Sequence, residues 1–243
     1  MKGVNTVEVS LGDLHVHTCC SDGWPTPREV VDYARRSTPL DVIAITDHDT
    51  IEGALWAADY AAGLEGGPLV VVGEEVSTRD GHVLGLFLRE RIRPRMSAAA
   101  TVDAIHDQGG IAIAAHPFWR TERPSAPSGP GKIHGVGWKA VDIDFDAVEV
   151  ENATPGLYLY NQMAYRLHEQ TLLAATGSSD AHILDAIGRA YTEFPGQGEA
   201  ALREAIVRGD TAALRVRYRA MGLVRYMAWS IDHRRQRRLT ANA

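Results

Sequence analysis

The sequence lacks several features that would place the protein in a membrane or an oxidising compartment. It has no run of about 18 apolar residues, the length that a membrane-spanning helix needs, so we expect no membrane partner. The first residues, MKGVNTVEVS, hold no apolar signal core, so we expect no export. The only two cysteines, Cys19 and Cys20, are adjacent and make no disulfide framework. These features together favour the cytoplasm.

Charge is unevenly distributed along the chain. The net charge is −6, yet residues 215–238 hold eight arginines against one acid, Asp232. That segment is therefore locally +7, and the rest of the chain is near −13. An acidic body argues against broad nucleic-acid wrapping and suits a protein that holds cations. The basic segment has three interpretations, namely a surface helix on the body, an oligomer contact or an RNA contact.

Length and composition favour one globular α/β domain. The 243 residues are 45% hydrophobic and 23% charged, which excludes a disordered chain. Short apolar segments, rich in β-branched residues or alanine, are typical of buried parallel strands. The predicted strands are Leu11–His15, Val42–Thr46, Val70–Glu75, Val83–Leu88, Ile111–Ala115, Ala147–Glu149 and Leu172–Thr176. Seven strands with mostly helical connections predict an irregular α/β barrel spanning residues 1–243.

Helix signals lie between most of these strands. Thr26-Pro27-Arg28-Glu29 is a capping box that opens a helix to about Arg36. Asp49 or Thr50 caps a second helix to about Ala62, and Ser97 opens a third that Gly109-Gly110 stops. Two more helices are predicted at Leu157–Gln170 and Ala200–Arg208. No helix fits between Glu75 and Val83, so a hairpin is expected there.

Two further segments have a distinct character. Residues 121–139 are rich in proline and glycine and too polar for a core, so we expect a lid or binding loop there. Residues 220–238 are expected to form a basic helix. Its predicted apolar side consists of Met221, Leu223, Val224, Met227 and Ala228.

Histidines gather where the predicted strands end, which is the edge that carries the active site of an α/β barrel. Residues i, i+2 and i+4 of a strand share a face, so Asp13, His15 and His17 are expected to point one way. Two imidazoles on one face can bind a single metal ion, with Asp22 in the following loop as a further ligand. The alternative is that these histidines are solvent-exposed strand ends.

His48 lies between Asp47 and Asp49, directly after an apolar run. Aspartates beside a ligating histidine can accept its second ring N–H. The alternative is a capping cluster for the next helix, a role that Asp49 can fill at the same time.

Acids and histidines end the remaining strands as well. Glu74 and Glu75 point to opposite faces, so at most one faces the barrel interior, and periodicity does not choose between them. His82 beside an apolar strand is a ligand or a structural histidine. Ala112, Ala114 and His116 are expected to share a face, with space beneath the imidazole. Asp180 and His182 repeat the two-residue spacing of a two-ligand pair.

Nitrogen and carboxylate ligands without cysteine suit Zn²⁺, Mn²⁺ or Fe²⁺. About nine ligands, at three or four per ion, predict two or three divalent cations. Such multi-metal sites activate a bridging water and clamp a phosphoryl group during in-line displacement.

The motifs DLHVHTCCSDG, AITDHDT, GEEVST, HVLGL, AHP and GSSDAH, in this order, resemble the PHP (polymerase and histidinol phosphatase) family of metal-dependent phosphoesterases. The likeness runs from about Leu11 to Phe194. It implies a distorted seven-stranded βα barrel and a site for two or three metals at the carboxyl ends of the strands. It also implies that Glu75, in the pattern Gly-x-Glu, is the bridging carboxylate, and that His82 is a ligand.

By this resemblance the ligands divide among three cations. One takes His15, His17, Glu75 and Asp180; a second takes Glu75, His82 and His116; a third takes Asp22, His48 and His182. Asp22 stands where some members have histidine. The resemblance also places Arg189 near the phosphate, and Asp180 or His182 is a candidate proton relay besides its ligand role.

Substrate contacts are predicted at Arg120, Arg189, Asn152 and His134. Guanidinium groups bind phosphate oxygens bidentately, and the alternative for each arginine is a surface salt bridge. Asn152 is a pocket group or a turn residue, and His134 belongs to the predicted loop. His106, His168 and His233 are interpreted as helix-surface residues.

The expected reaction is hydrolysis of a small phosphomonoester by hydroxide attack on phosphorus. By resemblance, the first substrate class is a nucleotide or nucleoside 3′,5′-bisphosphate, with short RNA ends as a related class. Histidinol phosphate and a cyclic sugar phosphate are the next choices. From other classes, the alternatives are a non-catalytic metal-binding or regulatory domain and an amidohydrolase-like enzyme that cleaves a C–N bond.

Overall fold

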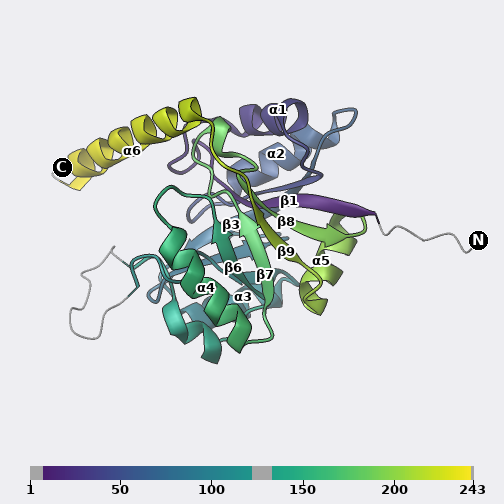
Figure 1. The fold of residues 1–243 in the computed structure, drawn as a ribbon, viewed down its shortest axis with the longest axis vertical. Helices are drawn as coiled ribbons and strands as arrows, with labels where there is room; N and C mark the ends of the chain where they lie inside the picture. Colours follow the sequence, from purple (N-terminus) through teal and green to yellow (C-terminus); the bar gives the residue numbers. More distant parts are fainter. Residues whose placement is uncertain (1–7, 122–132, 242–243) are drawn as a thin grey trace, which may run out of the picture.

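The computed structural model describes residues 8–121 and 133–241, with side chains described up to Gln236. Within these residues, one curved sheet of nine strands forms the body, and helices cover its outside (Figure 1). The strands are β1 (Val9–Val16), β2 (Val42–Ile45), β3 (Leu69–Ser77), β4 (His82–Leu86), β5 (Ile111–Ala114), β6 (Ala147–Asn152), β7 (Ala174–Ser178), β8 (Ala190–Pro195) and β9 (Ala212–Arg215).

The sheet order is β7-β6-β5-β4-β3-β2-β1-β8-β9. Pairing is parallel along β1-β2-β3 and β5-β6-β7, and antiparallel where β4, β8 and β9 join their neighbours. The curved sheet brings β7 against β1, β8 and β9. Across this seam the His17 N–H donates to the Ala181 carbonyl at 2.8 Å, and the Gly177 N–H donates to Thr192 Oγ1 at 3.0 Å. The sheet is therefore a nearly closed barrel, which confirms the predicted fold class.

The seven predicted strands are present, and the β3–β4 hairpin is confirmed by the pairing of Ser77 with His82. The strand count of a (β/α)7 barrel is not reproduced, because β8 and β9 add two antiparallel strands that were not predicted. Strand β8 alternates between buried and partly exposed residues, and β9 is mostly exposed. Neither has the continuous apolar run of a strand buried on both faces.

The helices are α1 (Pro27–Ser37), α2 (Glu52–Ala62), α3 (Ala98–Asp107), α4 (Tyr158–Gln170), α5 (Gly198–Arg208) and α6 (Ala220–Ala241), with short 3₁₀ helices η1 (Gly137–Asp142) and η2 (Leu184–Ala186). The capping box at Thr26 and the Ser97 cap are confirmed. Of the two caps predicted for α2, Thr50 Oγ1 accepts a hydrogen bond from the Glu52 N–H at 3.3 Å, at the first residue of the helix. Asp49 instead accepts a hydrogen bond from the Ser77 N–H at 2.7 Å.

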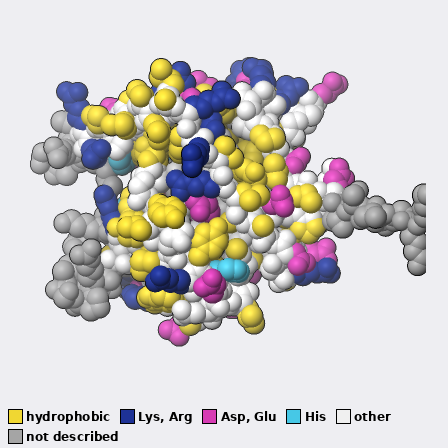
Figure 2. Space-filling model, viewed as in Figure 1, with side chains coloured by type: hydrophobic (Ala, Val, Ile, Leu, Met, Phe, Trp, Pro, Cys, Tyr) yellow, Lys and Arg dark blue, Asp and Glu magenta, His cyan; other side chains and the backbone are white. Residues whose placement is uncertain are grey.

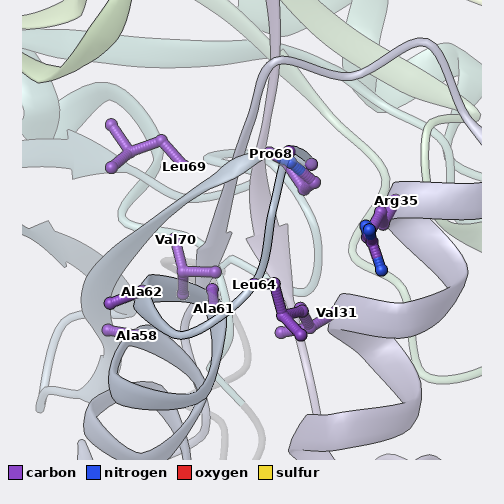
Figure 3. Close-up of a pocket in the computed structure, with 11 residues that line it drawn as sticks. Val31, Arg35, Ala58, Ala61, Ala62, Leu64, Pro68, Leu69 and Val70 are labelled. Atoms are coloured by element: carbon purple, nitrogen blue, oxygen red, sulfur yellow. The ribbon is translucent and has the colours of Figure 1, made fainter.

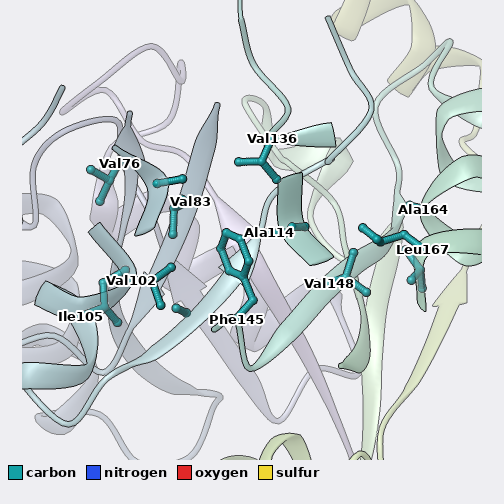
Figure 4. Close-up of a cluster of buried hydrophobic side chains, with 14 of the residues drawn as sticks. Val76, Val83, Val102, Ile105, Ala114, Val136, Phe145, Val148, Ala164 and Leu167 are labelled. Carbon is teal, nitrogen blue, oxygen red and sulfur yellow. The ribbon is translucent and has the colours of Figure 1, made fainter. Parts of the chain in front are cut away.

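Three buried apolar clusters hold the layers together. One cluster packs α3 and α4 against the four strands from β3 through β6, and it includes Val83, Phe145 and Leu167 (Figure 4). A second packs α1, α2 and α6 on β1 and β2. The third contains Leu84, Leu86 and Phe194 together with residues of α5. Because Val83 and Leu84 lie in different clusters, both faces of the sheet are buried, as expected for a barrel.

Helix α6 confirms the predicted basic helix but presents a different side to the body. Met221, Val224 and Met227 are 60%, 58% and 64% exposed, whereas Tyr226 and Trp229 are buried. The predicted apolar side therefore lies largely in solvent, and two aromatic residues make the contact with the body instead. Figure 2 shows hydrophobic and basic side chains gathered along α6. Residues 122–132 of the predicted loop at 121–139 lie outside the described residues.

Among the described residues, no helix has both the length and the apolar character needed to cross a bilayer.

Leu84 is fully buried, so its truncation should leave a cavity in the core. Leu84→Ala is expected to lower the free energy of unfolding by about 2–5 kcal/mol, because the emptied volume loses packing contacts. Leu159→Ala, at a residue 73% exposed on α4, serves as the control and should change it by less than about 0.5 kcal/mol. Urea unfolding followed by circular dichroism measures both. Equal effects in the two variants would contradict the placement of Leu84.

Candidate metal centre

The Glu75 carboxylate is the centre of the histidine cluster. Its Oε2 lies 3.2 Å from His15 Nε2, His17 Nε2 and His48 Nδ1. Its Oε1 lies 2.6 Å from His82 Nδ1 and 3.0 Å from His116 Nε2. One buried carboxylate thus contacts five imidazoles, which come from four separate segments of the chain. Glu74 points to the other side of β3, where Oε2 accepts a hydrogen bond from the Ile92 N–H.

All nine predicted ligands come together at one end of the barrel. Asp180 Oδ1 lies 3.5 Å from His15 Nε2 and 3.3 Å from His17 Nε2. His182 Nε2 lies 3.1 Å from Asp22 Oδ1. Four groups have ligand atoms close enough to share an ion: His17, Asp22, His48 and His182; His15, Glu75 and His116; His15, His17 and Asp180; and His48, Glu75 and His82. The geometry is therefore compatible with more than one cation, and the division of the ligands among three cations stays a proposal.

The local backbone departs from regular strand geometry where the ligands are positioned. The register of β1 against β2 shifts between Asp13 and Val16, and Leu14 packs with Phe194 rather than with the helices that Val16 contacts. The strict alternation predicted for Asp13 to His17 is therefore interrupted, although His15 and His17 still face the same cluster.

His116 shows a similar departure. Ala112 and Ala114 lie in the cluster with α3 and α4, so they do not lie beneath the imidazole as predicted. A positive φ of 26° at His116 turns its side chain out of the strand alternation, and Asp180 has a φ of 51°. Backbone strain of this kind is typical of functional sites.

The loop that carries Asp22 is held by Asp47. The Asp47 carboxylate accepts hydrogen bonds from the Thr18 N–H at 2.7 Å, the Thr18 hydroxyl at 2.6 Å and the Ser21 hydroxyl at 2.6 Å. Asp47 was expected to accept from the neighbouring His48, and it orders this loop instead. Asp22 then faces His182, His17 and His48.

Glu149 is a residue of the centre that the sequence analysis missed. This fully buried β6 side chain lies 3.0 Å from His15 Nδ1 through Oε1 and accepts hydrogen bonds from the His116 N–H and the Ser178 hydroxyl. A carboxylate behind a ligating imidazole fixes its tautomer and orientation. The available signal was a lone acid between Val148 and Val150, on the strand face that Ala147 shares.

Asn152 orients Asp180. Its Nδ2 donates to Asp180 Oδ2 at 3.2 Å and to Glu149 Oε2 at 3.0 Å, and its Oδ1 accepts from the Thr154 N–H. The Thr154 hydroxyl also donates to Asp180 Oδ2. Asp180 Oδ1 is thereby left to face the histidines. The side-chain nitrogen and oxygen of Asn152 both form hydrogen bonds within the protein. Its contact with substrate stays a prediction.

Arg120 and His134 lie together at the rim of the cluster. Arg120 Nη1 is 3.4 Å from His134 Nε2, and the His134 ring is 4.9 Å from the His82 ring. The backbone next to His82 lies close to the backbone next to His134, at Gly81 and Gly135. Glycine is needed there, because a Cβ on Gly81 would lie 2.5 Å from the Gly135 carbonyl carbon. The His82 N–H then donates to the His134 carbonyl at 2.7 Å. Their substrate contacts stay predictions.

Arg189 makes other contacts. Its Nε donates to the Asp185 carbonyl at 2.9 Å, Nη1 donates to the Arg217 carbonyl at 3.4 Å, and the guanidinium lies 5.9 Å from the Tyr218 ring centroid. In the described structure it forms no ion pair with a predicted ligand. Its role toward phosphate therefore stays a prediction.

Trp229 and His233, both on α6, also reach the cluster. The Trp229 ring lies 4.2 Å from the His182 ring, and His233 Nδ1 lies 3.7 Å from Asp22 Oδ2. The interpretation of His233 as a helix-surface residue is wrong, because α6 turns this side toward the barrel. A sequence offers no spacing signal for a contact between residues 22 and 233.

The electrostatics of the cluster follow from burial opposed by opposite charges. Burial alone would lower the pKa of His17, but the carboxylates of Asp180 and Glu75 raise it to about 10. Burial lowers the pKa of His48 to about 4, against the pull of Glu75 and Asp22. Burial would raise the pKa of Glu75, yet the surrounding histidines bring it well below its usual range. The carboxylates are therefore ionised at neutral pH.

The donor set fits divalent cations. Imidazole nitrogens and carboxylate oxygens are the ligands that Zn²⁺, Mn²⁺ and Fe²⁺ accept, and no cysteine sulfur faces the cluster in the described residues. His182 Nδ1 lies 2.9 Å from the Asp180 carbonyl, which leaves Nε2 as the acceptor nitrogen facing Asp22. Buried carboxylates and imidazoles at these separations are what a multi-metal centre requires.

A separate cavity of about 330 Å³ lies between α1, α2 and the start of β3 (Figure 3). Ala58, Leu64, Pro68 and Val70 are among its lining residues, and Arg35 is at its edge. It contains none of the predicted site residues.

Comparison with known proteins identifies the family. A model described as PHP-associated matches residues 159–211. Uncharacterized protein MJ1587 of Methanocaldococcus jannaschii is 36% identical over 58% of this chain and 81% of its own length. The 3′,5′-nucleoside bisphosphate phosphatase of Chromobacterium violaceum is 44% identical over 30% of this chain and 26% of its own length.

Among solved structures, a two-domain protein from Bacteroides vulgatus, described as containing a PHP-like metal-dependent phosphoesterase, has a TM-score of 0.67 at 22% identity. The match covers 86% of this chain and 65% of that protein, so this chain spans just under two thirds of it. Together with the barrel and the ligand cluster, these matches show that the chain belongs to the PHP family of metal-dependent phosphoesterases.

The raised pKa of His17 predicts that cations and protons compete for the centre. In the metal-free protein this imidazole holds a proton near pH 7, and only its neutral form ligates a metal. Mn²⁺ binding should therefore release protons, and its apparent affinity should rise with pH and fall as the solution is acidified. Calorimetry in two buffers of different ionisation enthalpy measures the release. Identical heats in both buffers would contradict the assignment.

Glu149 provides a second test. Glu149→Gln is expected to weaken Mn²⁺ binding about 10- to 100-fold, because the carboxylate that orients His15 loses its charge. Glu193→Gln, on strand β8, is the matched control and should leave metal affinity unchanged. Equilibrium dialysis with metal analysis gives both affinities. Parent-like binding in Glu149→Gln would show that Glu149 does not support the centre.

Proposed function

We propose that this protein hydrolyses a small phosphomonoester, with a nucleotide or nucleoside 3′,5′-bisphosphate as the first substrate class. The observation that carries the proposal is the convergence of five imidazoles on the Glu75 carboxylate, with Asp22 and Asp180 beside them. The similarity to a 3′,5′-nucleoside bisphosphate phosphatase supports the substrate class. That similarity covers about a quarter of the phosphatase, so substrate choice is the part most open to test.

We propose His15, His17, Asp22, His48, Glu75, His82, His116, Asp180 and His182 as the metal ligands. When bound, two or three divalent cations (Mn²⁺, Fe²⁺ or Zn²⁺) supply Lewis-acid charge at the phosphoryl group and lower the pKa of a water. The protein's own part is to hold the ligand atoms in place. Asn152 and Thr154 donate hydrogen bonds to one oxygen of Asp180, and Glu149 fixes the ring of His15.

Substrate binding is assigned to the rim. The Arg120 guanidinium supplies positive charge for phosphate oxygens at the edge of the cluster. Burial, together with His82 and His116, lowers the pKa of His134 to about 3, so this imidazole is neutral at physiological pH. His134 therefore offers the substrate a hydrogen bond rather than a charge. Asp180 and His182 use their available atoms toward the cluster, which favours a ligand role over the alternative of proton relay.

The deciding experiment is phosphate release from a panel of esters with Mn²⁺ added. The panel holds mononucleotides, nucleoside 3′,5′-bisphosphates, histidinol phosphate, cyclic sugar phosphates and short RNA. Turnover of the nucleotide class is expected, and chelation should abolish it. Bound metal without release from any ester would contradict the proposal and favour a regulatory metal-binding domain or C–N hydrolysis.

Two variants test the residue roles. Asp180→Asn is expected to lower kcat at least about 100-fold, because the cluster loses a charged ligand. Arg120→Ala should raise KM about tenfold with metal content unchanged, a loss of about 1.4 kcal/mol in binding. Arg208→Ala, on the far end of α5, is the matched control and should keep parent kinetics. Parent-like kinetics in Asp180→Asn would overturn the site assignment.

A further inference from the structure

Helix α6 follows the segment that the family model matches and extends outward from the body (Figure 1), and its residues Trp229 and His233 contact the ligand cluster. It is joined to the body by polar contacts as well as by packing. Arg225 forms an ion pair with Asp185 of η2, and the Trp24 indole N–H donates to Asp232 at 3.2 Å. These contacts fix the rotation of α6 about its own axis.

The side of α6 that faces the barrel touches two metal-ligand residues. The Trp229 indole N–H donates to the Asp22 carbonyl at 2.8 Å, and its ring centroid lies 4.2 Å from that of His182. His182 in turn stacks on His17 at 4.2 Å, with 18° between the ring planes. A continuous column of rings therefore runs from His17 through His182 and Trp229 to His233, which stacks on Trp229 at 5.3 Å.

His233 approaches the same aspartate from its other side. Its Nδ1 lies 3.7 Å from Asp22 Oδ2, whereas Asp22 Oδ1 faces His182 Nε2 at 3.1 Å and His17 Nδ1 at 3.7 Å. Asp22 is thus contacted by α6 at its backbone carbonyl and at its carboxylate. Asp47 holds this loop at Thr18 and Ser21, and the contacts from α6 act on Asp22 itself.

General hydrophobic docking does not account for this arrangement. The large aliphatic residues of α6, including Met227 and Ile231, are 64% and 63% exposed. Tyr226 and Trp229 are buried in their place. The helix therefore presents the side chains that meet Asp22 and His182, and leaves its aliphatic side in solvent.

We propose that α6 is a working part of the metal centre, in which Trp229 and His233 position Asp22 and His182 for the cation that these residues share with His17 and His48. Trp229 limits rotation of the His182 ring and holds the Asp22 backbone, and His233 restrains the Asp22 carboxylate. The inference rests on the proposed metal centre. It does not depend on which ester is hydrolysed.

The test counts Mn²⁺ ions and their affinities by equilibrium dialysis with metal analysis, on the full chain. Trp229→Leu and His233→Ala are expected to weaken one cation about 10- to 100-fold while the others bind as in the parent. Met227→Ala and Ile231→Ala, on the exposed side of α6, are the matched controls and should match the parent in every site. His233→Ala also keeps the test decisive if Trp229→Leu fails to fold.

A double variant identifies the affected cation. Asp22→Ala should remove the same ion, so adding Trp229→Leu to it should cause no further loss, as expected for residues that act on one site. Parent-like affinities in both Trp229→Leu and His233→Ala would overturn the proposal. An equal weakening of all cations, with a lower melting temperature of the metal-free protein, would do so as well, since it would show a general structural role. Complete absence of bound Mn²⁺ in the parent would instead refute the metal centre itself.

Discussion

The Glu75 carboxylate is buried among five histidines, and this burial determines how the segments of the barrel meet. An ionised carboxylate removed from water is costly unless it is closely paired, and Glu75 is 1% exposed. Five imidazoles surround it, so the segments carrying His15, His48, His82 and His116 must meet at one point. The barrel departs from regular strand geometry near these ligands, with a register shift in β1 and a positive φ at His116.

Supporting groups extend outward from this carboxylate in a consistent pattern. Glu149 restrains His15, Asn152 and Thr154 restrain Asp180, and Asp47 restrains the loop of Asp22. Each supporting residue leaves an oxygen or nitrogen of a ligand directed at the cluster. The cluster is therefore held in shape by hydrogen bonds within the protein itself.

The sequence predicted the parts of this arrangement that have local signals. Buried parallel strands are recognisable as apolar runs, and ligands follow them because the carboxyl ends of strands share one edge. Periodicity left Glu74 and Glu75 equivalent, and the family pattern chose Glu75, which the geometry places in the cluster. Strands β8 and β9 were not predicted, because β8 alternates between buried and partly exposed residues and β9 is mostly exposed. The roles of Glu149, Trp229 and His233 were not predicted, because their contacts join residues more than 100 positions apart in the sequence.

Cations held by the surrounding histidines are proposed to share Glu75. Anomalous X-ray diffraction from crystals grown with Mn²⁺ can test this sharing, because it locates the metal without reference to activity. We predict two or three anomalous peaks, at least two of them within about 2.2 Å of a Glu75 oxygen, with His82 and His116 on one and His15 and His17 on another. Peaks elsewhere on the molecule, or none at this cluster, would show that Glu75 is not a shared metal ligand.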